Sequence, residues 1–178
     1  MPEENNTFNP HDENLKPSYL SFKNYLKDLS KKSVDIKSFA GYFRRELLYK
    51  MQKDDFESPY LAMFDYELTF SGPEQNTIST RKIGFAVMYS NVSDDDLELQ
   101  YQRIDDAEQI IKEFMARIKL DCADEKHFLY RAFKKEGAIV TPVELEDNSF
   151  GSEVTLEFNN NQSLKAHADK WTDNFLKC

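Results

Sequence analysis

The chain has 178 residues, and its 32 acidic residues exceed its 23 lysines and arginines, which gives a formal net charge of −9 at pH 7. A chain of this length usually forms one domain with a sizeable core. The excess of acids argues against sequence-specific DNA binding and against adhesion to an anionic membrane, because both need clustered Lys and Arg. Two kinds of acidic protein remain: an assembly protein that lets nucleic acid pass, and a mimic that occupies a nucleic-acid-binding enzyme.

The sequence carries no pattern of a secretory leader or a membrane-spanning segment. No apolar run approaches the roughly 18 residues that a spanning helix needs. Residues 1–14 contain acids in place of a basic and then apolar leader. Two cysteines, Cys122 and Cys178, are too few for a disulfide framework. We therefore expect a protein of a reducing compartment.

Residues 1–16 are rich in Asn and acids and contain Pro2 and Pro10, which is typical of a flexible arm. Phe8 and Leu15 are apolar side chains within it. Two interpretations stay open: the arm frays in solvent, or it becomes ordered on a neighbouring subunit with Phe8 and Leu15 as anchors.

Residues 17–51 are expected to form two helices. The first begins at Pro17-Ser18, and its apolar residues recur at helical spacing: Tyr19, Phe22, Leu26 and Leu29. The second follows Asp35 and would align Phe39, Phe43 and Leu47 on one face. Gly41 inside that helix costs about 1 kcal/mol.

Residues 59–89 change to the two-residue period of strands. Apolar and polar side chains alternate over residues 59–70 and again over residues 82–89, and residues 71–76 have the composition of a turn. The pattern predicts an antiparallel hairpin. Its polar tip, residues 71–80, is longer than a minimal turn, and we expect it to reach an adjacent subunit.

A long amphipathic helix is predicted after Asp105 and Asp106, which would cap its first turn. Its apolar residues recur at steps of three and four: Ala107, Ile110, Ile111, Phe114, Met115 and Ile118. We expect this helix to pack across the sheet. Residues 97–101 either continue a strand or lead into the helix.

The remaining residues predict one more helix and a second hairpin. The helix spans residues 126–135 and ends at Gly137. Residues 138–145 form a strand that lies at an edge or bulges at Pro142, because proline cannot donate to a ladder. Residues 153–158 form the last strand. The expected fold is α+β: an antiparallel four-stranded sheet of two hairpins with a long helix across one face, preceded by N-terminal helices. Residues 17–158 would form one domain, and residues 159–178 a tail.

No motif in the sequence indicates catalysis or cofactor binding. Five scattered glycines form no phosphate loop. Cys122 and His127 have no zinc-site spacing, and residues 94–96 lack the pattern of a calcium loop. Asp65 and Glu67 are expected to face solvent. We therefore expect no catalytic residue, no cofactor and no metal.

Charged residues on the predicted strands have two interpretations. Lys82 can pair across strands with Glu153 or Glu157, which is a structural role. Alternatively, an edge strand is left open for a neighbouring subunit.

Several stretches together resemble a known family: SPYLAMFDYE (58–67), SG (71–72), IGFAVM (83–88), IDDAEQII (104–111), VTPV (140–143), GSEVTLEF (151–158) and KW (170–171). Their order resembles the small head–tail connector and tail-terminator ring proteins of tailed bacteriophages and prophages of Bacteroidetes, crAss-like phages included.

The resemblance implies a virion structural protein, made in the bacterial host cytoplasm, that forms a twelvefold or sixfold homo-oligomeric ring in the neck or tail. Its partners would be neighbouring portal, ring and tail proteins, with DNA passing without specific contacts. Subunit contacts are expected at Phe8, Leu15, Gly72, Pro73, Gln75, Asn76 and Trp171. The excess acids are expected to face the DNA path or the solvent.

Two other functions remain open. The first is an acidic binding module that inhibits a host nucleic-acid enzyme, which would need acids arrayed along one face. The second is an enzyme whose site unites residues distant in sequence, such as Asp65, Glu67, His127 and Tyr130.

Overall fold

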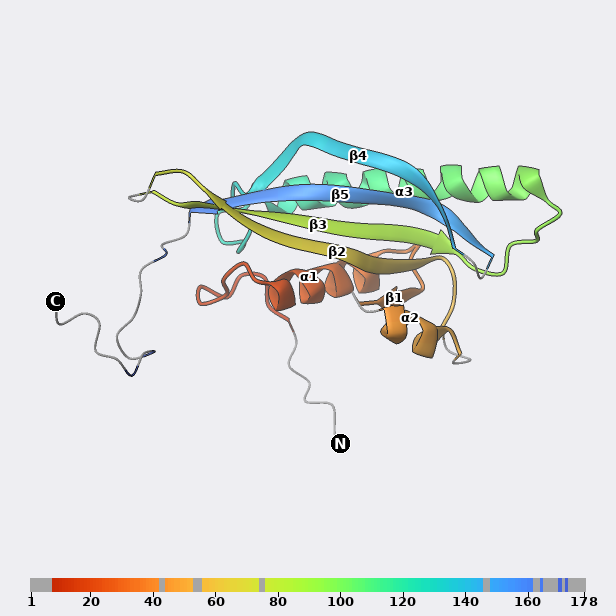
Figure 1. Cartoon of the computed structure of the whole chain (residues 1–178), viewed down its shortest axis with the longest axis horizontal. Helices are drawn as coiled ribbons and strands as arrows, with labels where there is room; N and C mark the ends of the chain where they lie inside the picture. The colour runs from red at the N-terminus through yellow and green to blue at the C-terminus, as the bar shows by residue number, and fades with distance from the viewer. Residues whose placement is uncertain are drawn as a thin grey trace.

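The computed structural model describes residues 8–41, 44–52, 56–73, 76–145 and 148–161, together with residues 164, 170 and 172. The helices are α1 (Tyr19–Lys32), α2 (Arg44–Met51) and α3 (Leu97–Asp121). The strands are β1 (Ser38–Ala40), β2 (Tyr60–Ser71), β3 (Ile78–Tyr89), β4 (Phe133–Leu145) and β5 (Ser149–Asn161). They form one sheet in the order β1-β2-β3-β5-β4 (Figure 1).

The α+β class and the long helix on the sheet are confirmed, and the sheet itself differs from the prediction. It has five strands among the described residues, and it is mixed, because β1 pairs parallel with β2 whereas the other neighbours pair antiparallel. Both predicted hairpins, β2–β3 and β4–β5, are present. The last strand continues to Asn161, three residues beyond the predicted end of the domain.

Helices α1 and α3 pack on the same face of the sheet, which we call the inner face. Phe22 and Leu26 of α1, Ile111 and Phe114 of α3, and Phe85 of β3 belong to one buried cluster. The opposite, outer face has a smaller buried cluster: Ala40, Tyr60, Ala62, Ala86 and Met88, with Leu47 of α2 packed against it.

Helix α1 starts where the sequence predicts. Ser18 accepts a hydrogen bond from the backbone N–H of Ser21, and the Ser21 hydroxyl in turn accepts one from the backbone N–H of Ser18. This reciprocal cap satisfies amides that would otherwise lack partners at the helix start. The buried side of the helix contains Phe22, Leu26 and Leu29.

The second helix predicted within residues 17–51, following Asp35, is wrong in its first part, and Phe43 of that prediction lies outside the described residues. Residues 38–40 form β1, whose Phe39 lies opposite Leu61 of β2. Helix α2 begins only at Arg44. The backbone N–H of Gly41 donates to Glu46 across 3.1 Å. Phe39 and Leu47, expected on one helix face, therefore belong to a strand and a helix.

The N-cap of helix α3 lies nine residues before Asp105, the first of its predicted caps. Asp96 is the N-cap, and its carboxylate accepts a hydrogen bond from the backbone N–H of Leu99 at 3.0 Å. The prediction of caps at Asp105 and Asp106 is wrong, because residues 97–104 are already helical. In Figure 1 the first turns of α3 lie beyond the end of β3.

The predicted helix over residues 126–135 is also wrong. Successive tight turns occupy this segment, with hydrogen bonds from the backbone N–H of His127 to Asp124 and of Tyr130 to His127. Arg131 has a left-handed backbone with φ of 56°, which no continuous α-helix accepts. Phe133 then starts β4 opposite Phe158.

Strand β4 pairs with β5 and lies at the edge of the sheet, so the prediction of an edge strand at Pro142 is confirmed. The irregularity of this strand is elsewhere, between Lys134 and Ile139, where the register shifts.

Candidate functional site

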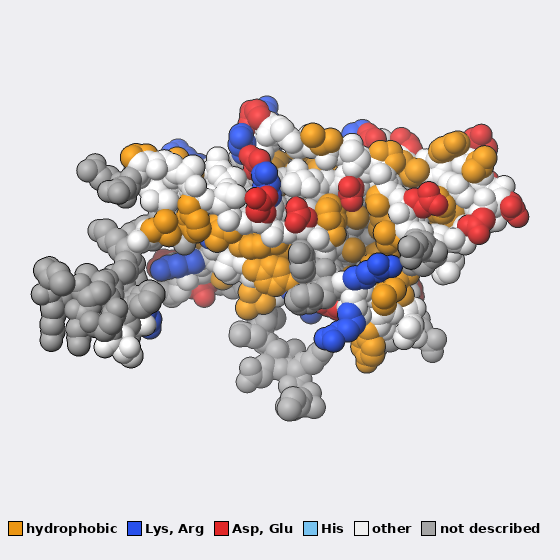
Figure 2. Space-filling view, viewed as in Figure 1, with side chains coloured by type: hydrophobic (Ala, Val, Ile, Leu, Met, Phe, Trp, Pro, Cys, Tyr) orange, Lys and Arg blue, Asp and Glu red, His pale blue; other side chains and the backbone are white. Residues whose placement is uncertain are grey.

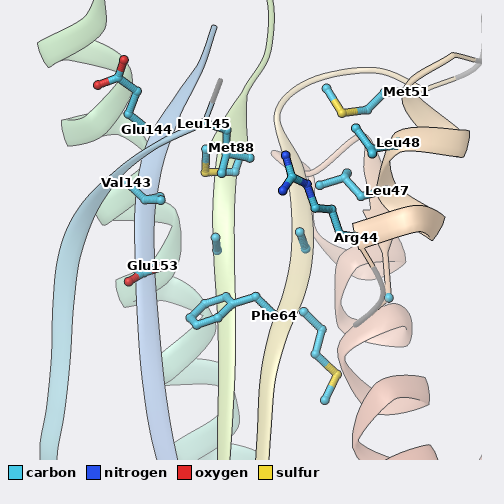
Figure 3. Close-up of a pocket in the computed structure, with 14 residues that line it drawn as sticks. Arg44, Leu47, Leu48, Met51, Phe64, Met88, Val143, Glu144, Leu145 and Glu153 are labelled. Atoms are coloured by element: carbon cyan, nitrogen blue, oxygen red, sulfur yellow. The ribbon is translucent and has the colours of Figure 1, made fainter. Parts of the chain in front are cut away.

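An open apolar groove of about 720 Å³ lies on the outer face of the sheet, between α2 and the β4–β5 hairpin (Figure 3). Its lining side chains are mostly aliphatic or thioether groups with one aromatic ring. They include Leu47, Leu48 and Met51 of α2, Ala62 and Phe64 of β2, Met88 of β3, and Val143 and Leu145 of β4.

The floor of the groove follows from strand register. Ala62 lies opposite Ala86, so two small side chains meet on the outer face of β2 and β3. The register shifts after Met63, and a Cβ added at Gly84 would meet Phe64 and Asp65 at 2.7 Å. Gly84 thus leaves room for the Phe64 ring, which lies at one end of the groove in Figure 3.

The two walls of the groove carry opposite charges. Arg44 lies on the α2 side, whereas Glu153 lies on the side of β5; the Glu144 carboxylate points away from the groove (Figure 3). Glu153 accepts a hydrogen bond from the Thr141 hydroxyl at 3.3 Å. The groove therefore has an apolar floor with a cation on one side and one acid on the other.

Glu46 fixes α2 beside the groove. Burial raises the pKa of Glu46, but hydrogen bonds from Lys50 Nζ at 2.8 Å and from the Gly41 backbone at 3.1 Å outweigh this and hold it below its usual value. The ionised carboxylate also lies 3.8 Å from Lys23 of α1. These contacts tie α2 to its neighbours.

Beyond the groove, a row of charges crosses the outer face of the sheet. Lys82 lies 3.6 Å from Glu67, and Lys134 lies 3.1 Å from Glu157. Lys82 and Glu157 are also register partners. The predicted solvent-facing position of Glu67 is confirmed, and the cross-strand pairing of this row is a structural role.

The start of α3 forms a second notable surface, which we call the α3 tip (residues 94–101). It contains four acids and no base. Leu97 and Tyr101 are 58% and 63% exposed, although they are large apolar or aromatic side chains. The buried Gln100 amide donates to the carbonyl oxygens of Ser93 and Asp94, at 2.9 and 3.2 Å, and so fixes the preceding loop.

A buried polar cluster lies at the other end of α3. The Tyr25 hydroxyl and Arg117 Nε both donate to Asp121, at 2.7 and 2.8 Å. Burial raises the pKa of Tyr25, and the hydrogen bond to Asp121 raises it further, so the phenol stays a donor. Burial lowers the pKa of His127. Burial also raises the pKa of Cys122 to about 12, so its thiol stays protonated and is a poor nucleophile at neutral pH.

The four residues named for a possible enzyme do not converge. Asp65 lies beside Gly84 on the outer face, and Glu67 follows two residues later on the same side of β2. His127 instead contacts Tyr25 on the inner face, with ring centroids 5.3 Å apart. The sheet separates the two sets. Within the ranges that the structure describes, no group of His, Cys, Asp and Glu is placed to hold a metal ion.

The predicted interface residues are dispersed. Phe8 packs edge-on against Phe128 of its own chain, with centroids 6.0 Å apart, and Leu15 is half-buried. Gly72, Pro73 and Asn76 are exposed at the tip of the β2–β3 hairpin, where Gly72 has φ of 90°. Gln75 and Trp171 lie outside the described residues. Contact of these residues with a neighbouring subunit stays a prediction.

Sequence reasoning missed both the groove and the α3 tip. The groove unites residues from 41 to 153, so no local pattern reveals it. The tip had a usable signal: residues 94–98 combine acids with Leu97 ahead of the predicted helix. No helix among the described residues has the length and apolarity needed to cross a lipid bilayer. A scan against protein-family models and a search of curated proteins both found no match for the chain.

Proposed function

We propose that this chain is a structural subunit that acts by docking to other subunits, and specifically that it forms part of the oligomeric ring between portal and tail of a tailed bacteriophage. The observation that carries the proposal is the apolar groove on the outer sheet face. Leu48, Phe64 and Leu145 along it are 46%, 38% and 37% exposed. Contiguous exposed apolar surface of this kind marks sites where another protein binds.

The shape of the groove favours a protein segment as its occupant. It is an open trough between a helix and a strand hairpin, and its polar groups lie along opposite walls (Figure 3). Grooves with an apolar floor and charged edges suit an amphipathic helix, whose apolar side fills the floor and whose flanks meet the charges. Such contacts are how ring subunits join.

The distribution of charge favours a docking subunit over a nucleic-acid mimic. A mimic needs acids at phosphate-like spacing along one surface, whereas from Arg103 onward the acids of α3 are interspersed with bases. Glu108 pairs with Lys112 at 2.7 Å, and Arg103 pairs with Asp106 at 3.1 Å. The net charge of −9 suits a ring through which DNA slides, since it offers few phosphate contacts.

Mass photometry and electron microscopy of the purified full chain, alone and mixed with portal and tail proteins of tailed bacteriophages, test this proposal. The expected result is closed rings of sixfold or twelvefold symmetry, or stacking of such a ring on portal particles. A chain that stays monomeric at every concentration and joins neither portal nor tail particles contradicts the proposal.

A further inference from the structure

We propose that β2 pairs along its open edge with β2 of a second copy of this chain, so that the two sheets join into one. Residues 65–71 of the two copies would run antiparallel, with Leu68 of each copy at the two-fold axis. This pairing goes beyond the proposed function, because it forms whether or not the chain also joins a ring. Three features support it: the open edge, the apolar side chains beside it and the self-complementary order of its residues.

Strand β1 covers only the start of β2. Its three residues pair with residues 60–62, and β2 runs on to Ser71 at the tip of the hairpin (Figure 1). Along residues 65–71, β3 is the one strand that pairs with β2 within the described part of the chain. That pairing has no register shift from Asp65 onward. The other side of this segment therefore presents a regular row of backbone N–H and C=O groups to which a further strand can add.

Apolar side chains on the inner face of this segment remain accessible. Tyr66 lies opposite Ile83 of the inner-face cluster, so Leu68 and Phe70, two and four residues later, lie on the same face. Leu68 is 37% exposed and Phe70 is 45% exposed. When two copies pair about Leu68, the two Leu68 side chains meet and each Tyr66 meets Phe70 of the other copy. The added strand therefore covers apolar surface that the single chain leaves in water. In Figure 2 hydrophobic side chains reach the surface along the sheet.

The outer face of the segment is also complementary to itself. In the same register, Glu67 lies opposite Thr69 of the other copy, and Asp65 lies opposite Ser71. No two like charges are directly opposite, and each carboxylate faces a hydroxyl that can donate a hydrogen bond to it. Lys82 of the same chain lies 3.6 Å from Glu67, so this acid keeps a cation beside it when the copies pair. A second copy thus matches this edge on both faces of the sheet.

Charges introduced at position 69 test the pairing by sedimentation velocity on the full chain. Thr69→Lys places a cation opposite Glu67 of the other copy at two symmetric positions, and it should lower the dissociation constant of the pair about fivefold. Thr69→Glu places an acid there and should raise that constant about fivefold. Leu120→Lys and Leu120→Glu, at a side chain 69% exposed on α3, are the controls and should leave it unchanged. Equal dissociation constants for the two Thr69 variants, or a wild-type chain that never forms a pair, would overturn the inference.

A second measurement does not depend on charge. The chain has two cysteines, of which Cys122 is buried, so Leu68→Cys combined with Cys178→Ser leaves an accessible thiol at the proposed axis. Residues directly opposite in an antiparallel pair have Cα atoms about 4.5–5.5 Å apart, so a short thiol-to-thiol crosslinker should join two copies through position 68. Leu120→Cys with Cys178→Ser is the control and should give few joined copies. Equal crosslinking through positions 68 and 120 would speak against the pairing.

The outcomes separate this pairing from the proposed function. Pairs that respond to the Thr69 variants and crosslink through position 68, in a chain that joins no portal or tail particle, support the pairing and contradict the ring. Rings whose assembly ignores the Thr69 variants and yields no crosslink through position 68 leave the ring function standing and reject the pairing. A chain that stays monomeric in every one of these experiments rejects both.

Discussion

The Tyr25 hydroxyl donates a 2.7 Å hydrogen bond to Asp121, 96 residues later in the sequence, and so joins two helices. Tyr25 belongs to α1 and Asp121 ends α3. Both helices lie on the inner face of the sheet, and this contact fixes one against the other where α3 ends.

Tyr25→Phe removes this hydrogen bond and keeps the ring. Bonds to a charged acceptor contribute about 1.5–3 kcal/mol, and we expect a loss of about 2 kcal/mol in the free energy of unfolding because Arg117 still holds Asp121. Urea titration measures it. Tyr101→Phe, at an exposed tyrosine, is the matched control and should change stability by less than about 0.5 kcal/mol. Equal losses of stability from Tyr25→Phe and Tyr101→Phe would contradict a stabilising role for the hydrogen bond from Tyr25 to Asp121.

Phe114→Ala tests the packing of α3 on the sheet. Phe114 is 5% exposed, and its ring lies 6.1 Å from that of Phe85 of β3. Truncation should lower the free energy of unfolding by about 3–5 kcal/mol, because it leaves a cavity between helix and sheet that the surrounding backbone cannot fill. Leu120→Ala, on the exposed side of the same helix, should cost less than about 0.5 kcal/mol. A loss below about 1 kcal/mol at Phe114 in a denaturant titration would refute this packing.

Gly151→Ala probes the close approach of β5 to β3. A Cβ at Gly151 would fall against the backbone carbonyl oxygen of Val87 and within 3.0 Å of the Met88 Cα. Backbone cannot move aside without breaking the ladder, so we expect a loss of about 3 kcal/mol or more in thermal or urea unfolding.

Gly41→Ala is the control for that substitution. A Cβ at Gly41 would meet side-chain atoms of Glu46 and Lys23, which can shift more readily than backbone, at the cost of weaker bonds from Gly41 and Lys50 to Glu46. The expected loss is about 1–2 kcal/mol, smaller than at Gly151. Equal losses at Gly41 and Gly151 would show that close contact with backbone is not what constrains β5.

The pH dependence of stability should include a contribution from His127. Burial lowers its pKa, so the unfolded chain binds this proton more readily than the folded chain does. Stability from this group is complete above the unfolded pKa of about 6.5 and decreases as pH falls through that value toward the lower folded pKa. One proton changes the free energy of unfolding by at most about 1.4 kcal/mol per pH unit.

His127→Asn isolates this contribution. Its side-chain oxygen can replace Nδ1, which accepts a hydrogen bond from the Leu129 backbone at 3.2 Å, but it does not titrate. Urea titrations between pH 7 and 5 should show the stability advantage of the wild type over the variant shrinking as pH falls. Parallel profiles for wild type and His127→Asn would rule out the effect.

Local patterns predicted most of the helices and strands, because a long element repeats the periodic spacing of its apolar residues several times. Strand β3 and helix α3 each present several apolar residues at one period. Strand β1 has three residues, too few to show alternation, and Phe39 matched a helical spacing with Leu47 instead. The turns before β4 resembled a helix for a similar reason, since Phe128, Leu129 and Phe133 recur at compatible steps.

The groove could not be predicted from the sequence, because the pairing register of the strands brings its residues together. Ala62 and Ala86 form part of the groove floor only because the β2–β3 pairing places them opposite each other. Phe64 lies over Gly84 only because the register shifts after Met63. Neither pairing nor shift is encoded within one segment. The exposed positions of Leu97 and Tyr101 likewise depend on where α3 extends past the sheet.

The β4 edge of the sheet discourages main-chain association. β4 combines Pro142 with a register shift between Lys134 and Ile139, so it offers no long regular row of free amides. Strand pairing between copies would therefore stop at two, which protects the chain at high concentration from fibrillar aggregation. Contacts between such pairs would rest on side chains instead, which dissociate and re-form with changing salt. An assembly made this way can correct a misplaced subunit before it closes.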